Sequence, residues 1–244
     1  MPVRREAIRQ KAKRFPDAAR EVWKQALLDR NRSIRGLACW HLTKAGGTSP
    51  STIYRNAVNI APESLSALEG LSETADESDL DFFRHLLKHL LPSRRCVAVR
   101  GLVRIGKESL VNEVLPLLQD DSPSVVRAVW NTIGPYLDVV PQNDLFAAAM
   151  DGKLLVARHA AVDMLADMNK WESLSWLLKI ASEAREDTAA HAELIIRKLC
   201  ARNSVFTKPS KLSKETITRE LERSRNSVAE EVLNLVEIEL NRFG

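Results

Sequence analysis

Asp81, His85 and His89 recur at every fourth position, which would place a carboxylate and two imidazoles on one face of a helix. Two histidines and a carboxylate at this spacing could share a zinc ion. However, the sequence specifies no further ligand nearby, and the two histidines alternate with apolar residues of the same stretch. A solvated helix face is therefore the favoured interpretation, and we expect no metal.

The segment 101–108, Gly-Leu-Val-Arg-Ile-Gly-Lys-Glu, meets the first seven positions of the phosphate-binding loop pattern. Its eighth position requires Ser or Thr to hold magnesium, and Glu108 stands there instead. The pattern also needs a preceding strand, whereas these residues are typical of a helix that ends at Gly106. We therefore expect no nucleotide-binding loop.

Nucleophilic catalysis has equally little support. No Gly-x-Ser-x-Gly motif presents a serine. Cys39 lies close to His41 in the sequence, but near neighbours on a helix do not face each other, so they form no catalytic pair. The sequence predicts no catalytic residue and no cofactor, and we do not expect an enzyme.

The elements that must position these residues are helices throughout. Apolar residues recur at intervals of three and four, as in Ile34, Leu37, Ala38 and Leu42, and no sustained period-2 alternation occurs. Glycine and proline are scarce, with 9 and 10 residues in 244, and aromatic residues make up 5%. This composition disfavours an all-β fold. Turn residues group the predicted helices into the pairs 16–28 with 32–45, 51–60 with 63–73, 78–91 with 93–105, 107–119 with 122–134, 141–150 with 153–168, 171–182 with 187–201, and 213–224 with 227–243.

A short motif repeats along these pairs. Asp29 precedes Ile34-Arg35 by the same interval at which Asp121 precedes Val126-Arg127. Asp151 precedes Ala157-Arg158 with one residue more, and the segment 97–106, which contains Arg100, matches 125–134. A period of roughly 30 residues with two helices in each unit predicts an α-solenoid.

The Asp-x-x-x-x-Val-Arg motif, in a helix that ends in Ile-Gly, resembles the second helix of HEAT repeats over residues 16–201. The resemblance implies an all-α, right-handed α-solenoid of about 6–7 antiparallel helix pairs, with 1–244 as a single domain. Its parts would be a basic N-terminal capping segment (1–15), the repeats (16–201), a linker loop (202–212) and a C-terminal capping helix pair (213–244). A ladder of caps and ion pairs would tie adjacent repeats together through Asp29, Arg35, Arg100, Asp121, Arg127, Asp151 and Arg158.

The charge is unevenly distributed. The net charge is +4, yet residues 1–104 hold 19 Lys and Arg against 11 Asp and Glu, and the rest holds 17 against 21. In HEAT-like solenoids the second helices line the concave face, and the predicted second helices 32–45 and 93–105 contain no acidic residue. The residues expected to bind there are Arg32, Arg94, Arg95 and Arg104, with Trp40 and Trp130 as anchors.

These features favour a non-catalytic scaffold or adaptor whose concave face binds a protein partner with an acidic segment. Three widely spaced cysteines and the lack of a secretory signal favour the cytoplasm. Apolar runs are too short for a membrane span, so no membrane partner is expected. Two alternatives remain open. One is a nucleic-acid-binding solenoid resembling HEAT-like DNA-alkylation-repair glycosylases, and the other is a regulatory subunit or enzyme on a helical-repeat scaffold. The oligomeric state is not specified by the sequence.

Overall fold

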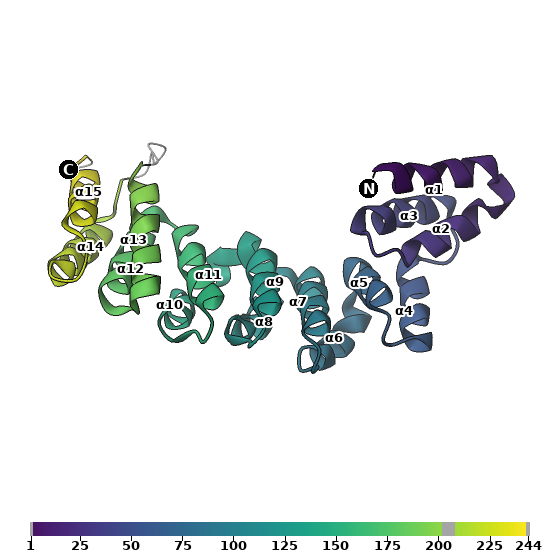
Figure 1. The fold of residues 1–244 in the computed structure, drawn as a ribbon, viewed down its shortest axis with the longest axis horizontal. Helices are drawn as coiled ribbons and strands as arrows, with labels where there is room; N and C mark the ends of the chain where they lie inside the picture. Colours follow the sequence, from purple (N-terminus) through teal and green to yellow (C-terminus); the bar gives the residue numbers. More distant parts are fainter. Residues whose placement is uncertain (1, 202–207, 243–244) are drawn as a thin grey trace. The chain divides into compact units, whose positions relative to one another are not determined.

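The computed structural model describes residues 2–201 and 208–242. Within these ranges the chain forms helices joined by short turns, and no strand occurs (Figure 1). The prediction of an all-α fold is therefore confirmed. The chain divides into two compact units, Met1–Lys107 and Glu108–Gly244. No helix in the described ranges is both long and apolar enough to cross a membrane.

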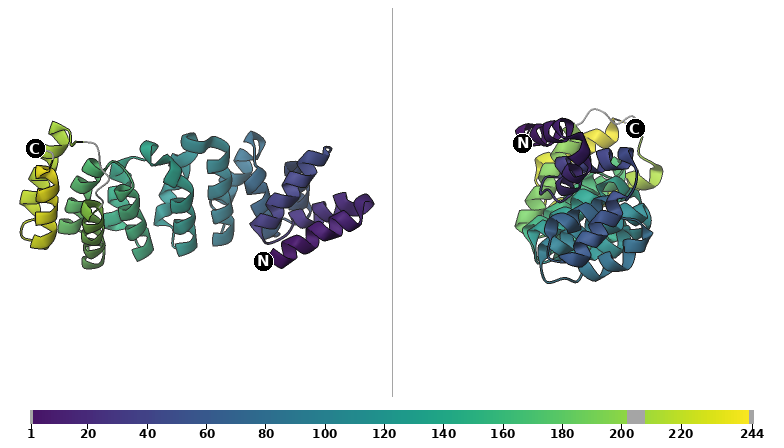
Figure 2. Two further views of the ribbon diagram at one scale, coloured as in Figure 1. Left: turned by 90° about the horizontal axis from the view of Figure 1, so that it is seen from above. Right: turned by 90° about the vertical axis from the view of Figure 1, so that its right-hand side faces the viewer.

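The first unit consists of helices that pack in sequential pairs. α2 packs on α3, α4 on α5, and α6 on α7. An additional helix, α1, lies against α2 and corresponds to the basic segment expected at 1–15 (Figures 1 and 2). The bounds are α1 Pro2–Arg14, α2 Ala19–Leu27, α3 Arg32–Ala45, α4 Pro50–Ile60, α5 Leu65–Thr74, α6 Leu80–Leu86 and α7 Pro92–Gly106, with short 3-10 turns at Pro16–Ala18 and Glu77–Asp79.

Side-chain caps and glycine contacts explain why these helices begin and pack as they do. The Asn31 side chain accepts a hydrogen bond from the Ser33 N–H at 2.9 Å, which caps α3. In the core, the buried ring of Phe83 lies against Gly101, where an added Cβ would approach ring atoms to 2.7 Å. The buried ring of Tyr54 lies against a glycine of α5 in the same way. A glycine in the second helix thus makes room for an aromatic ring from the first.

The second unit arranges its helices in two layers. α9, α11, α13 and α15 pack one against the next, and α10, α12 and α14 form the layer beside them (Figure 1). The bounds are α8 Val111–Val114, α9 Pro123–Ile133, α10 Gln142–Asp151, α11 Leu155–Ala166, α12 Lys170–Glu183, α13 Glu186–Ala201, α14 Lys211–Ser224 and α15 Glu230–Asn241. Of the predicted linker 202–212, residues 202–207 lie outside the described ranges, and α14 begins within its last residues.

Two predicted helices differ from the observed ones, and each contains or precedes a proline. The segment predicted as one helix at 107–119 is divided into the 3-10 turn Lys107–Leu110, α8, and the 3-10 turn Leu115–Gln119. Pro116 has no backbone N–H to donate within a continuous helix, and its ring clashes with the preceding turn. The helix predicted at 78–91 ends at Leu86, and Leu91 is extended immediately before Pro92, which begins the next helix.

Candidate binding surface on α1 and α3

Three aromatic rings meet where α2 packs on α3. The His41 ring stacks on the buried ring of Trp23 at 4.0 Å between centroids, with 9° between the planes. Trp40 meets the same imidazole edge-on, at 4.7 Å and 86°. Adjacent residues of a helix point about 100° apart. His41 therefore faces α2 while Trp40 turns to solvent, where 56% of its surface is exposed.

A groove of about 680 Å³ opens beside Trp40. We call it the Trp40 groove, and it is lined by Arg5 and Arg9 of α1 and by Ser33, Gly36, Leu37, Trp40 and His41 of α3. The two arginines are four residues apart and so lie on one face of α1. At Gly36, open space lies where a side chain would stand, which leaves the surface next to Trp40 free. A second cavity of about 400 Å³ is lined by Trp23, and Arg9 and His41 line both cavities.

The surroundings of the Trp40 groove are positively charged. Burial, followed by the charges of Arg9 and Lys44, lowers the pKa of His41, so its imidazole is neutral at pH 7. The Lys44 ammonium lies 5.0 Å from the centre of the Trp40 ring, within cation–π distance. Arg9 approaches Glu6 at 3.5 Å on the exposed side of α1, and Arg5 forms no ion pair with any described residue. The groove is thus suited to an anionic ligand that also offers an apolar side chain.

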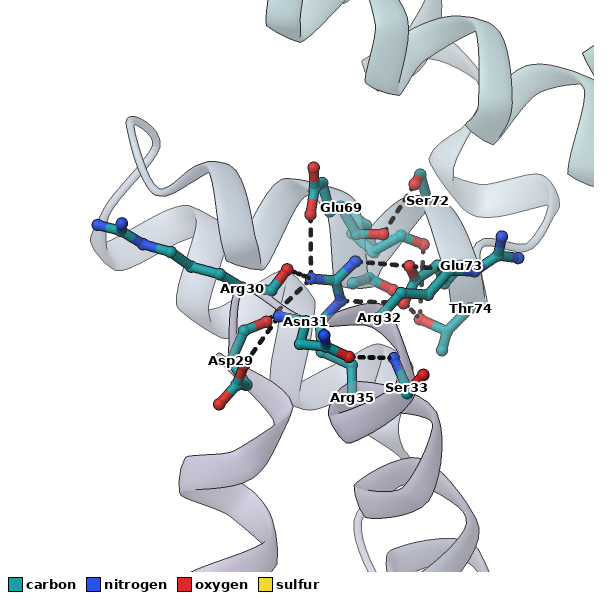
Figure 3. Close-up of polar contacts among 12 residues, drawn as sticks. Asp29, Arg30, Asn31, Arg32, Ser33, Arg35, Glu69, Ser72, Glu73 and Thr74 are labelled. Carbon is teal, nitrogen blue, oxygen red and sulfur yellow. Dashed lines mark hydrogen bonds and ion pairs between the residues drawn. The ribbon is translucent and has the colours of Figure 1, made fainter. Parts of the chain in front are cut away.

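A different arginine of α3 is buried and structural. Only 3% of the Arg35 side chain is exposed, and its Nη1 donates to the carbonyls of Asp29 and Arg30 at 2.9 and 3.0 Å (Figure 3). It also contacts Glu73 at 2.6 Å and Glu69 at 3.0 Å on α5. Burial opposes the charge of Arg35, but the hydrogen bond and charges of these glutamates leave its pKa raised.

Arg158 repeats this geometry in the second unit. Its Nη1 donates to the carbonyls of Gly152 and Lys153 at 2.9 and 3.5 Å, again six and five residues earlier in the chain. Its other nitrogens donate to Asp187 at 2.6 Å and to the Thr188 hydroxyl at 2.8 Å, both on α13. Each of these arginines therefore joins the turn before its own helix to the second helix of the following pair.

In two of the three helix pairs between them, the structure shifts the repeat register. Arg35 and Arg158 are the fourth residues of α3 and α11, and the fourth residue of α7 is Arg95. Arg95 donates to the carbonyls of His89 and Leu90 at 2.7 and 3.0 Å, whereas Arg100, which the sequence suggested for the ladder, is exposed. The fourth residue of α9 is a buried valine, and Arg127, one position later, is exposed.

The aspartates of the predicted ladder also occupy different positions. Asp29 accepts a hydrogen bond from the Asn31 N–H at 2.8 Å, but the side chain that caps α3 is that of Asn31. The equivalent bond in the second unit comes from Asp120, which accepts from the Ser122 N–H at 2.8 Å. Asp121 is exposed and pairs with an exposed lysine, and Asp151 is the exposed last residue of α10.

The remaining binding residues expected from the sequence do not gather at the Trp40 groove. The exposed side chain of Arg32 is 3.6 Å from Glu73, and Arg94 contacts a ring nitrogen of His89 at 3.0 Å. Arg104 is exposed on α7. Trp130 is half-buried in the second unit, where it lines a cavity of about 190 Å³.

The predicted face formed by Asp81, His85 and His89 does not form, because α6 ends before His89. His85 Nδ1 faces the carbonyl of Asp81 at 3.2 Å, and His89 accepts from the Leu91 N–H at 3.0 Å. Among the described residues, no group of three or more His, Cys, Asp or Glu side chains is arranged to hold a metal ion.

The chain matches no protein-family model and no curated protein sequence. Among solved structures it is similar to the designed armadillo repeat protein YIII(Dq)4CqI, with 16% sequence identity and a TM-score of 0.40. The likeness covers 91% of this chain and 98% of the designed protein. The all-helical fold itself is established by the helices and their packing described above.

The sequence analysis identified Trp40 but not its arginine neighbours in the groove. Its basic residues were sought on the predicted second helices, whereas Arg5 and Arg9 come from the capping segment. Their four-residue spacing was the available signal. The packing of α1, which brings that face beside α3, could not be predicted from this spacing.

Proposed function

We propose that this chain is a non-catalytic protein-interaction module, a right-handed HEAT-like stack of about 6–7 helix pairs. Its Trp40 groove would bind an acidic segment of a partner protein. The observation that carries this proposal is a tryptophan with 56% of its surface exposed in a groove walled by Arg5 and Arg9. Exposed tryptophan and arginine are the residue types that dominate binding energy at protein interfaces.

The chemistry of the groove favours a carboxylate-bearing peptide. Arginine forms bidentate hydrogen bonds with carboxylates, and the flat Trp40 ring can cover an apolar side chain from the same segment. A nucleic acid is disfavoured because Glu6 lies beside Arg9, and Glu73 lies beside the exposed Arg32. These carboxylates would repel a continuous phosphate backbone, whereas a short peptide can avoid them.

Fluorescence anisotropy with a labelled peptide of alternating Glu and Leu tests the proposal. Replacing a hot-spot residue costs at least about 2 kcal/mol of binding free energy, so Trp40→Ala should weaken binding about 30-fold. Ile60→Ala is the matched control, since Ile60 is an exposed apolar residue of the same unit, at 85% exposure. Arg5→Gln should also weaken binding, while Arg14→Gln on the same helix should have little effect.

Three results would overturn the proposal: no binding of the peptide by the wild-type protein, equal losses in Trp40→Ala and Ile60→Ala, or equal losses in the two arginine variants. A labelled single-stranded oligonucleotide is the competing ligand. If it bound more tightly than the peptide and lost affinity steeply with added salt, the nucleic-acid alternative would replace this proposal.

A further inference from the structure

His41 lies between two neighbouring cavities of the first unit. Its imidazole lines both the Trp40 groove and the adjoining cavity of about 400 Å³. It is held between two tryptophan rings, stacked on Trp23 at 4.0 Å and in edge contact with Trp40 at 4.7 Å. A ligand in the Trp40 groove would therefore lie next to a group that can change its charge near neutral pH.

The charged groups that face His41 are mostly positive. From α1, the two cavities are lined by Arg5, Arg9 and Lys13, with Glu6 as the single carboxylate. α3 adds Lys44, whose charge acts on His41, and α2 contributes the uncharged Trp23 and Ala19. In the free protein this environment disfavours a further positive charge on the imidazole.

We propose that His41 takes up a proton when an acidic segment occupies the Trp40 groove, so that the groove binds its ligand more tightly as the pH falls below neutrality. This inference rests on the proposed function. Burial is the largest cause of the low pKa of His41, and the charges of Arg9 and Lys44 follow; ligand carboxylates would offset these two charges. The pKa of His41 would therefore be higher in the complex than in the free protein.

The sign of the pH dependence follows from this difference. Above both pKa values of His41, the imidazole is neutral in the free and bound states, and affinity does not depend on its protonation. As the pH falls through the higher, bound-state pKa, the complex takes up a proton and is stabilised relative to the free protein. An opposite charge within about 4–6 Å shifts a pKa by roughly one unit or more. One unit corresponds to about tenfold in affinity.

Isothermal titration calorimetry with the same Glu and Leu peptide tests the inference. Titrations at about pH 8 and about pH 5.5 stay above the peptide carboxylate pKa of about 4.3. We expect tighter binding at the lower pH, by up to about tenfold. In phosphate and Tris buffers of the same intermediate pH, the difference in apparent enthalpy should report net proton uptake. His41→Phe, which retains a ring against Trp23 but cannot be protonated, should bind with a smaller pH dependence and without that uptake.

An NMR titration of the His41 imidazole, free and with peptide, gives a second measurement that needs no variant. A higher pKa in the complex supports the inference. An unchanged pKa, a pH-independent affinity, or a pH dependence that persists fully in His41→Phe would overturn it while leaving the proposed function standing. Absence of peptide binding at every pH would instead overturn the proposed function and this inference with it.

Discussion

Replacing Arg35 by methionine should destabilise the first unit far more than the same replacement at an exposed arginine. Methionine keeps much of the aliphatic stem but none of the donors. The buried bond to the Asp29 carbonyl and the bond to the Arg30 carbonyl would be lost, along with the ion pairs to two glutamates of α5. A buried polar group left without its partner costs about 1–3 kcal/mol.

The ion pairs raise this cost further. Removing one partner of a fully buried pair costs about 3–5 kcal/mol. Glu69 and Glu73 retain 26% and 21% of their side-chain exposure, so water would solvate part of the charge that Arg35 leaves behind. We therefore expect Arg35→Met to lower the free energy of unfolding by about 3–5 kcal/mol in total. For a unit of this size, that corresponds to a decrease in Tm of about 10 °C or more.

Thermal and urea unfolding, followed by circular dichroism, would measure the difference. Arg127→Met is the matched control, because Arg127 is exposed and should change stability by less than about 0.5 kcal/mol. Glu73→Gln should fall between the two, since it removes the charge but keeps a side chain able to accept a hydrogen bond. Equal destabilisation by Arg35→Met and Arg127→Met would refute the assignment of Arg35 as the residue that joins α3 to α5.

Three further predictions concern packing, a buried ion pair and pH. Gly101→Ala should destabilise the protein by about 1–2 kcal/mol, since its Cβ would lie 2.7 Å from the Phe83 ring. Gly36→Ala, whose Cβ meets open space in α3, should stabilise it by about 0.5–1 kcal/mol. Shifts of the urea midpoint in the same direction for both variants would contradict this. Lys170→Met should cost about 3 kcal/mol in chemical unfolding, because it removes the buried partner 2.6 Å from Glu239 of α15 and leaves that buried carboxylate with the half-exposed Arg242 at 3.2 Å. A loss below about 1 kcal/mol would contradict a stabilising role. Burial, followed by the charge of a stacked neighbouring histidine, lowers the pKa of His159, so Tm should fall as the pH decreases below about 6.5. His159→Gln should reduce that fall. If the dependence of Tm on pH were the same in the variant and the wild type, His159 would not contribute to it.

The helix pairs could be predicted from the sequence because periodicity and turn residues act locally. Predicted 32–45 coincides with α3, and predicted 187–201 begins one residue inside α13. The prediction of a continuous helix at 107–119 was wrong. The apolar spacing continues past Pro116, but it gives no information about the backbone N–H that proline lacks. The apolar pattern therefore predicted a continuous helix where a backbone constraint prevents one.

The register of the arginines could not be obtained from the sequence in the same way. Their acceptors are backbone carbonyls five and six residues earlier, and every residue has a carbonyl. A choice between Arg95 and Arg100 depends on the residue at which α7 begins, and a shift of one position turns a side chain by about 100°. Matching the Val-Arg pairs therefore aligned the repeated sequence motifs, but it assigned Arg100 to the turn where the structure has Arg95.

Burial distinguishes structural arginines from those available for binding, although both kinds contribute equally to the net charge. The Arg35 side chain is 3% exposed and that of Arg158 is 5% exposed, and both neutralise carboxylates of a following helix. Arg5 and Arg9 line an open groove and have little compensation from the described residues. The first group should therefore affect unfolding, and the second should affect binding. Arg35→Met with reduced stability, beside Arg5→Gln with normal stability and reduced peptide affinity, would demonstrate that division. A loss of both properties in both variants would instead mean that α1 is needed to stabilise the unit, and the groove arginines would then have no claim to a separate role.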